Sequence, residues 1–77
     1  MSKYAPSQRT LDQINNEFTY HSPKEDQASR YTAIRDKAKE LAHLIAAETP
    51  VSREQSSALT RLEECVMHAN AAIARNE

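Results

Sequence analysis

Two aromatic rings and several cations lie close together in the first half of this chain. Tyr20 and His21 come shortly before Lys24, and Arg30 and Arg35 follow within the next three helical turns. Flat rings stack on nucleobases, and lysine or arginine side chains bind phosphate, so this combination is what a nucleotide requires. The residue types therefore predict a binding site for a nucleotide or another small organic anion.

The same stretch has the pattern of a helix N-terminus. In the sequence Ser-Pro-Lys-Glu at 22–25, Ser22 would accept from the backbone N–H of Glu25, and Glu25 would bond back to the N–H of Ser22. The proline fits the first helical position, and the helix dipole would favour phosphate beside Lys24. A hydrophobic staple involving Phe18 would explain the aromatic residues by stability alone. Binding site and scaffold both stay open at this point.

Apolar residues at spacings of three and four predict an all-α fold. A short helix over about 11–17 would begin after a Thr10 cap, and long helices would span 23–48 and 53 to about 75, the last capped by Ser52. The two long helices, separated by a short break at a proline, form an antiparallel αα-hairpin. Their apolar seams are Tyr31, Ile34, Ala38, Leu41 and Ile45 on one helix, and Leu59, Leu62, Val66, Ala69 and Ile73 on the other.

A chain of 77 residues cannot bury much apolar surface by itself. Cys65 is the only cysteine, so no internal disulfide can form, and its apolar flanks predict a small core residue rather than a nucleophile. Association with further copies is the remaining way to gain stability. A stripe of small residues on the last helix would allow such an approach: Ala58, Cys65, Ala69 and Ala72.

Composition excludes several classes of protein. Ten Lys plus Arg against eleven Asp plus Glu give a net charge of −1, which argues against a general DNA or RNA binder. The chain has no glycine, so P-loops and dinucleotide-binding turns are excluded. No apolar run is long enough for a membrane span and no signal-peptide pattern is present, so we expect no membrane partner and a cytoplasmic protein.

Metal binding and catalysis are disfavoured by the residue patterns. Glu40 and His43 form one Glu-x-x-His pair, and Glu64 and His68 have i,i+4 spacing. Di-metal bundles need the Glu-x-x-His motif twice with two further glutamates, so we expect no metal and no cofactor. No serine lies on a sharp turn of the kind hydrolases use. Tyr31 lies on the apolar seam and is assigned to the core, and the protein is predicted not to be an enzyme.

Three segments resemble a known family. They are residues 18–27 (FTYHSPKEDQ), residues 30–35 (RYTAIR) and residues 52–76, of which the tail ANAAIARN is the most specific. Together they are similar to the helical-hairpin family of phage anti-CBASS sponge proteins, which is related to the hairpin domain of anti-Thoeris sponges. The resemblance covers roughly residues 18–76, so we assign 18–77 to a hairpin domain and 1–17 to an N-terminal arm with a short helix.

This resemblance implies a compact homohexamer that sequesters cyclic oligonucleotide second messengers without cleaving them, in the cytoplasm of the infected host cell. It implies pockets for cyclic dinucleotides between protomers, with Tyr20 as the stacking ring and Lys24 and Arg35 on the phosphates. Some members bind cyclic trinucleotides in separate pockets near the symmetry axes, for which Asn70 and Arg75 are the candidates here. Two other classes stay open: a helical protein–protein interaction module or regulator, and a nuclease or phosphodiesterase.

Overall fold

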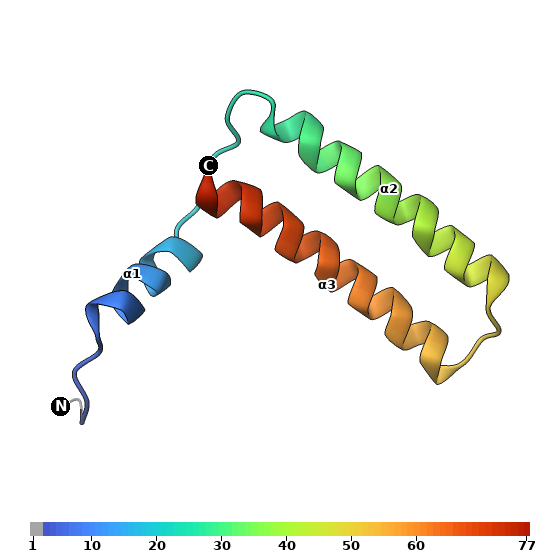
Figure 1. Ribbon diagram of the computed structural model, residues 1–77, viewed down its shortest axis with the longest axis horizontal. Helices are drawn as coiled ribbons and strands as arrows, with labels where there is room; N and C mark the ends of the chain where they lie inside the picture. Colours follow the sequence, from blue (N-terminus) through green and yellow to red (C-terminus); the bar gives the residue numbers. More distant parts are fainter. Residues whose placement is uncertain (1–2) are drawn as a thin grey trace.

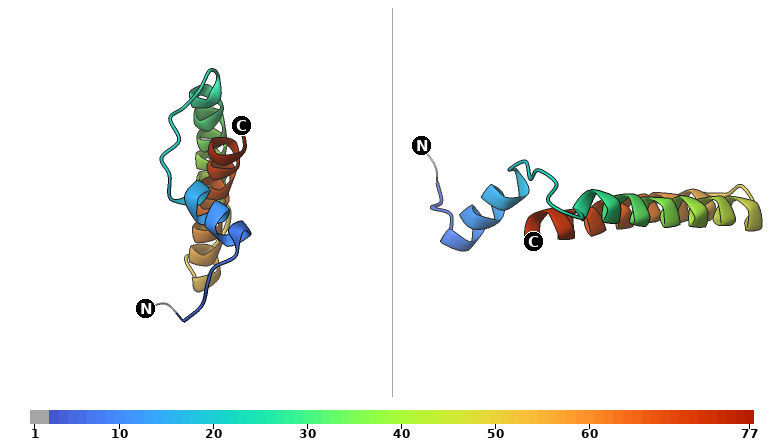
Figure 2. Two further views of the ribbon diagram at one scale, coloured as in Figure 1. Left: turned by 90° about the vertical axis from the view of Figure 1, so that its left-hand side faces the viewer. Right: turned by 90° about the horizontal axis from the view of Figure 1, so that it is seen from above.

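The computed structural model describes residues 3–77, and this part of the chain contains three helices and no strand. They are α1 (Gln8–Glu17), α2 (Gln27–Glu48) and α3 (Arg53–Asn76). α2 and α3 lie antiparallel, side by side, and α1 projects from the open end of this hairpin (Figure 1). The predicted all-α hairpin is confirmed. The molecule measures 52 × 36 × 15 Å, and the hairpin is a single layer of helices (Figure 2).

α1 begins earlier than predicted. Ser7, not Thr10, is the N-cap, and its Oγ accepts from the backbone N–H of Thr10 at 3.2 Å. Thr10 is therefore the third residue of the helix, because the serine three positions upstream already satisfies its N–H. The helix ends at Glu17 as expected, and the N–H of Phe18 closes the last turn on the carbonyl of Ile14 at 3.0 Å. Residues 1 and 2 of the predicted arm lie outside the described range.

The predicted start of α2 at Pro23, with Ser22 as its cap, is wrong. The helix begins at Gln27, and Glu25 has a φ of 43°, which is left-handed and breaks any helix through it. A turn takes its place: the N–H of Gln27 donates to the carbonyl of Lys24 at 2.8 Å, and the Lys24 N–H donates to the Gln27 side-chain oxygen at 2.9 Å. Because Gln27 satisfies this backbone, the capping box does not form.

Gln27 also joins the beginning of α2 to the end of α3. Its Nε2 donates to Glu77 Oε1 at 3.2 Å, and Arg30 donates to both carboxylate oxygens of Glu77, to Oε2 at 2.8 Å. Arg30 Nε also lies 3.3 Å from Asp26 Oδ1, so Arg30 forms an i,i+4 ion pair as well. The hydrogen bonds from Arg30 and Gln27 lower the pKa of Glu77 from 4.5 to about 2, and the bond to Glu77 raises the pKa of Arg30.

At the closed end of the hairpin, the predicted boundaries are confirmed. α2 ends at Glu48, and α3 begins after Ser52, whose Oγ accepts from the Gln55 N–H at 3.1 Å. The side chain of Gln55 does not return to Ser52 as a capping box would require. Its Nε2 instead donates to the carbonyl and the hydroxyl of Thr49, at 3.0 and 3.1 Å. These bonds fix the loop that reverses the chain.

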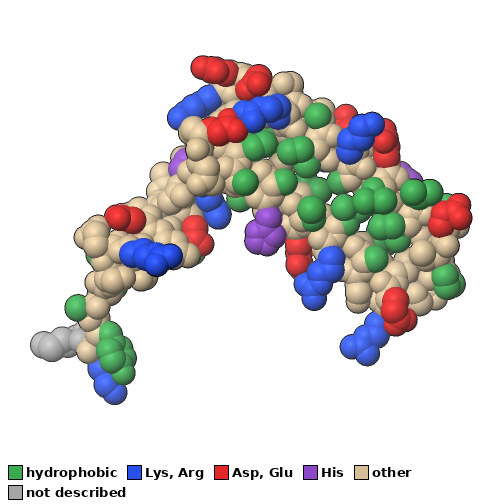
Figure 3. All heavy atoms as spheres, in the orientation of Figure 1, with side chains coloured by type: hydrophobic (Ala, Val, Ile, Leu, Met, Phe, Trp, Pro, Cys, Tyr) green, Lys and Arg blue, Asp and Glu red, His purple; other side chains and the backbone are tan. Residues whose placement is uncertain are grey.

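The hairpin buries little apolar surface. Every residue of the predicted α3 seam is half-buried, but on α2 Leu41 is exposed and Ala42, one residue further along, lies in the seam. Cys65 is also exposed, so its predicted core role is wrong for the single chain, because its stripe has no second layer against it. Within residues 3–77 the only buried residue is Gln27. Apolar side chains therefore lie along an open face of the hairpin (Figure 3).

No helix within residues 3–77 has both the length and the apolar character needed to cross a bilayer.

The Ser52 cap gives a first test of this fold. We expect Ser52→Ala to lower the free energy of unfolding by about 1 kcal/mol, because the Gln55 N–H at the start of α3 loses its acceptor. Chemical denaturation followed by circular dichroism measures this loss. Ser57→Ala, an exposed position inside α3, is the matched control and should change the free energy by less than about 0.5 kcal/mol. Equal losses in both variants would contradict the assigned cap.

The Glu77 contact gives a pH-dependent test. Its folded-state pKa is lowered to about 2 from 4.5, so its stabilising effect is complete above about 4.5 and is lost as pH falls toward 2. We therefore expect the wild type to be more stable than Glu77→Gln at neutral pH, with the difference shrinking over this acid window. Denaturant titrations across pH measure the difference, and Asp36→Asn on the exposed side of α2 is the control. A difference between wild type and Glu77→Gln that stays constant down to pH 2 would be inconsistent with the contact.

Candidate functional site

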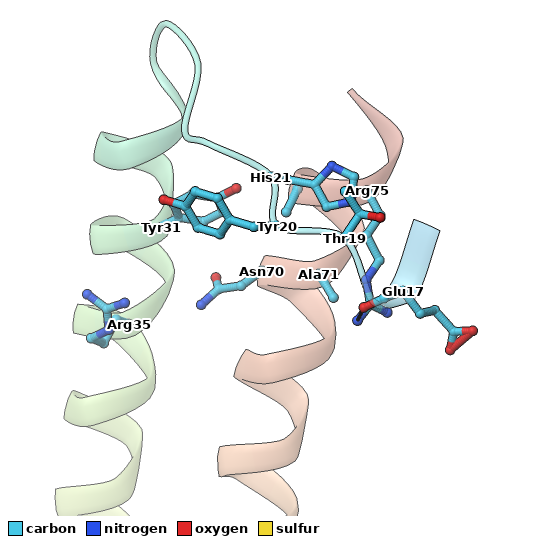
Figure 4. Close-up of a pocket in the computed structure, with 10 residues that line it drawn as sticks. Glu17, Thr19, Tyr20, His21, Tyr31, Arg35, Asn70, Ala71 and Arg75 are labelled. Atoms are coloured by element: carbon cyan, nitrogen blue, oxygen red, sulfur yellow. Dashed lines mark hydrogen bonds between the residues drawn. The ribbon is translucent and has the colours of Figure 1, made fainter. Parts of the chain in front are cut away.

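A hollow of about 350 Å³ lies at the open end of the hairpin, where the linker after α1 crosses the two long helices. Its walls come from four parts of the chain (Figure 4). They are Glu17 at the end of α1, Thr19, Tyr20 and His21 in the linker, Tyr31 and Arg35 on α2, and Asn70, Ala71, Ala74 and Arg75 on α3. This volume is at the lower end of the range for small-molecule sites.

Hydrogen bonds to the end of α1 hold the linker in this place. The His21 ring Nε2 lies 2.9 Å from the carbonyl oxygen of Asn16, and the Thr19 hydroxyl donates to the carbonyl of Asn15. Arg75 reaches across from α3 and its Nη2 donates to the carbonyl of Glu17 at 3.4 Å. These bonds fix the non-helical linker to the end of α1 and fix the end of α1 to α3.

The rings and the cations of the hollow come from different elements. Tyr20 stands on the linker with 81 % of its surface exposed, and Tyr31 lies half-buried on α2. The guanidinium groups of Arg35 and Arg75 come from α2 and α3. In Figure 4 the carboxylate of Glu17 extends away from Tyr20, and the Arg75 side chain reaches the end of α1, where it bonds to the Glu17 carbonyl. The arrangement favours a flat, anionic ligand.

Asn70 contributes an acceptor that has no hydrogen-bond partner among residues 3–77. It projects from α3 toward α2 in Figure 4, and its Oδ1 is buried without a hydrogen bond. A buried unsatisfied oxygen of this kind costs about 1–3 kcal/mol. A donor supplied from outside the chain, such as a ligand N–H or hydroxyl, would recover that cost.

The structure brings together five of the seven residues predicted to bind ligand. Two of them, Asn70 and Arg75, were expected in a separate axial pocket, but in the single chain they line the same hollow as the other three. The five are Tyr20, His21, Arg35, Asn70 and Arg75.

The other two predicted residues, Lys24 and Arg30, lie elsewhere. Lys24 precedes α2 instead of standing in its first turn, and it lines a smaller hollow of about 150 Å³ together with Gln27 and Glu77. Arg30 is engaged with Glu77 and Asp26. Both stay predictions as ligand contacts.

Sequence reasoning missed Tyr31 as a wall of the hollow. The residue lies on the seam as predicted, but the seam opens at this end and the ring borders the hollow as well. One signal was available, because Tyr31 and Arg35 are four residues apart and so share a helix face. Ala71 and Ala74 were also missed; their small side chains leave space for the hollow.

No group of three or more His, Cys, Asp or Glu side chains that could hold a metal ion occurs among residues 3–77. The pairs Glu40–His43 and Glu64–His68 therefore do not converge there into such a cluster. Glu40 instead lies 3.5 Å from Lys37.

The fold and the hollow define a small helical hairpin with a ligand-sized hollow at its open end. A family model described as Acb2/Tad1, hairpin domain, matches residues 10–74. The chain therefore belongs to this family of anti-CBASS and anti-Thoeris sponge proteins. The match begins at residue 10 and includes most of α1, so it extends further toward the N-terminus than the resemblance over 18–76. Searches of curated proteins and of solved structures found no match.

Proposed function

We propose that this protein binds and sequesters cyclic oligonucleotide second messengers without cleaving them, and thereby blocks the CBASS antiphage immunity of its host. One observation carries the proposal: in a chain of the sponge family, an exposed tyrosine ring and two arginine side chains line a single hollow. Sponge proteins act by holding the signal, so the site needs affinity and no reactive group.

The chemistry of the hollow fits a cyclic dinucleotide. Tyr20 offers a face on which a base can stack, and stacking of this kind tolerates any base. Arg35 can donate in pairs to phosphate oxygens, and we propose Lys24 as the second phosphate contact. Because the whole chain has a net charge of only −1, these local cations suffice for a small anion without making the protein a general nucleic-acid binder.

The polar groups of the linker favour binding over cleavage. The Thr19 hydroxyl and one nitrogen of the His21 ring are both engaged with backbone carbonyls of α1. A nucleophile needs a free base within hydrogen-bond reach, and this pair is instead used to hold the linker. The family's non-catalytic mode of action supports the same conclusion.

We further propose a homohexamer, working in the cytoplasm of the infected host cell. The hairpin is one layer thick and leaves its apolar face open within the described residues, so further copies would supply the missing second layer. Cyclic dinucleotides would bind where copies meet, at the hollow. Cyclic trinucleotides would bind in separate pockets that use Asn70 and Arg75 at the symmetry axes.

The proposal is tested by titration with cyclic di- and trinucleotides. Calorimetry should show binding, and heat denaturation of the complex should return the nucleotide intact by chromatography. Cleaved product would instead identify a nuclease or phosphodiesterase. If there is neither heat nor recovered nucleotide, the alternative of a helical protein–protein interaction module takes its place. Light scattering should give about six times the 8.7 kDa of one chain.

The stacking ring is the most direct target for mutation. We expect Tyr20→Ala to weaken cyclic-dinucleotide affinity about tenfold to a hundredfold, because one base loses its aromatic platform. Tyr4→Ala is the matched control, since Tyr4 is 78 % exposed but lies outside the hollow. An unchanged affinity in Tyr20→Ala would place the ligand elsewhere. Titration of the same variant with a cyclic trinucleotide separates the pockets: unchanged trinucleotide affinity supports two, and a matching loss supports one shared hollow.

The phosphate contact can be tested through charge. We expect Arg35→Ala to lower affinity about tenfold to a hundredfold and to make binding less sensitive to salt, because a charge-assisted bond to phosphate is lost. Arg61→Ala removes an equal charge on α3, where Arg61 pairs locally with Glu64 at 2.9 Å, and serves as the control. If both variants bind with the same affinity and salt dependence, Arg35 does not contact phosphate.

A further inference from the structure

α1 carries an apolar face that residues 3–77 of its own chain leave uncovered. Leu11 and Ile14 lie on one side of this helix and Phe18 is its C-cap, with 39 %, 45 % and 84 % of their surfaces exposed. A helix of 10 residues is marginal in water unless its apolar side packs against something. Another surface is therefore needed to keep α1 folded.

A suitable surface exists farther along the hairpin. Between α2 and α3 lies a groove of about 350 Å³ whose floor is apolar. It is lined by Ala38, Ala42, Leu59 and Leu62, with Arg35, Lys39 and Glu63 at the rim. The α2 side of the groove is lined by alanines and the α3 side by leucines, so the groove has room for apolar side chains of another helix.

α1 cannot reach this groove within its own chain. Arg75 bonds to the carbonyl of Glu17, which places the end of α1 beside the end of α3. From there α1 points away from the hairpin (Figures 1 and 2). Leu59, in the groove, lies 16 residues before Arg75 and so about 24 Å back along α3, in the direction opposite to the one α1 takes.

We infer that α1 of one copy packs into the α2–α3 groove of a second copy. The charges agree with this pairing. Glu17 stands at the edge of the apolar face of α1, while the rim of the groove carries two cations, Arg35 and Lys39, against the single carboxylate of Glu63. Arg9 lies on the opposite side of α1 and would face solvent.

This packing has a consequence for the ligand site. The linker that carries Tyr20 directly follows α1, so a neighbour that holds α1 also fixes one end of the linker. The inference rests on the self-association proposed above, but it does not require any nucleotide. A test in the absence of ligand therefore keeps it separate from the proposed sequestration.

Two single-cysteine chains test the packing. In a Cys65→Ser background, one chain carries Ile14→Cys and the other, labelled with ¹⁵N, carries Ala42→Cys. The two are unfolded together, refolded and oxidised, and the products are read by gel and mass spectrometry. We expect a disulfide between the labelled and the unlabelled chain, because α1 of one then lies in the groove of the other.

Matched variants keep this result decisive. Gln13→Cys, on the polar side of α1, replaces Ile14→Cys as the control and should form at least tenfold less of the cross-link. Leu59→Cys provides a second position on the opposite wall of the groove, in case Ala42→Cys disturbs the fold. Equal cross-linking from Gln13→Cys, or none from Ile14→Cys with either partner, overturns the inference.

Light scattering of the ligand-free chains separates the possible failures. If an oligomer is present but no disulfide joins the two chains, α1 packs elsewhere and self-association stands. A monomer overturns both the packing and the proposed assembly. We expect Ile14→Asp to raise the dissociation constant of the oligomer about tenfold to a hundredfold, which corresponds to one aliphatic side chain no longer buried.

Discussion

The carboxylate of Glu77 holds the open end of the hairpin together. At the other end a four-residue loop with its own hydrogen bonds connects α2 and α3, whereas here the helices would be free to separate. Arg30 and Gln27 close this end by binding Glu77 from α2. The seam between the helices is only half-buried, so the contact has more influence on the spacing than it would above a full core. That spacing sets how far the α2 wall of the hollow stands from the α3 wall.

Most of the fold could be predicted from the sequence because it depends on local signals. The apolar spacing, the Ser52 cap and the break after Glu48 each act within a few residues, and all three are confirmed. The start of α2 could not be predicted in the same way. The local pattern favours a cap at Ser22, but the side chain of Gln27 gains a partner 50 residues away and stabilises a turn instead.

The candidate site was predictable to the extent that residue chemistry reveals it. The rings of Tyr20 and His21 and the cation of Arg35 were identified by type and spacing, and they line one hollow. Tyr31 was assigned to the core because periodicity cannot show where a seam opens. Cys65 was misplaced for a related reason, since a stripe of small residues indicates close packing but does not say which chain provides the neighbour.

Tyr20 stands in the linker, outside the helices, so it is under a different structural constraint from the residues of the hollow that lie on α2 and α3. The helices must keep their seams and their contact at Glu77, so the residues on α2 and α3 that line the hollow are constrained by helix packing. The linker has no such periodicity, and its side chains can be exchanged without repacking the seam. Substitutions in the linker can therefore alter the surface of the hollow at little cost in stability.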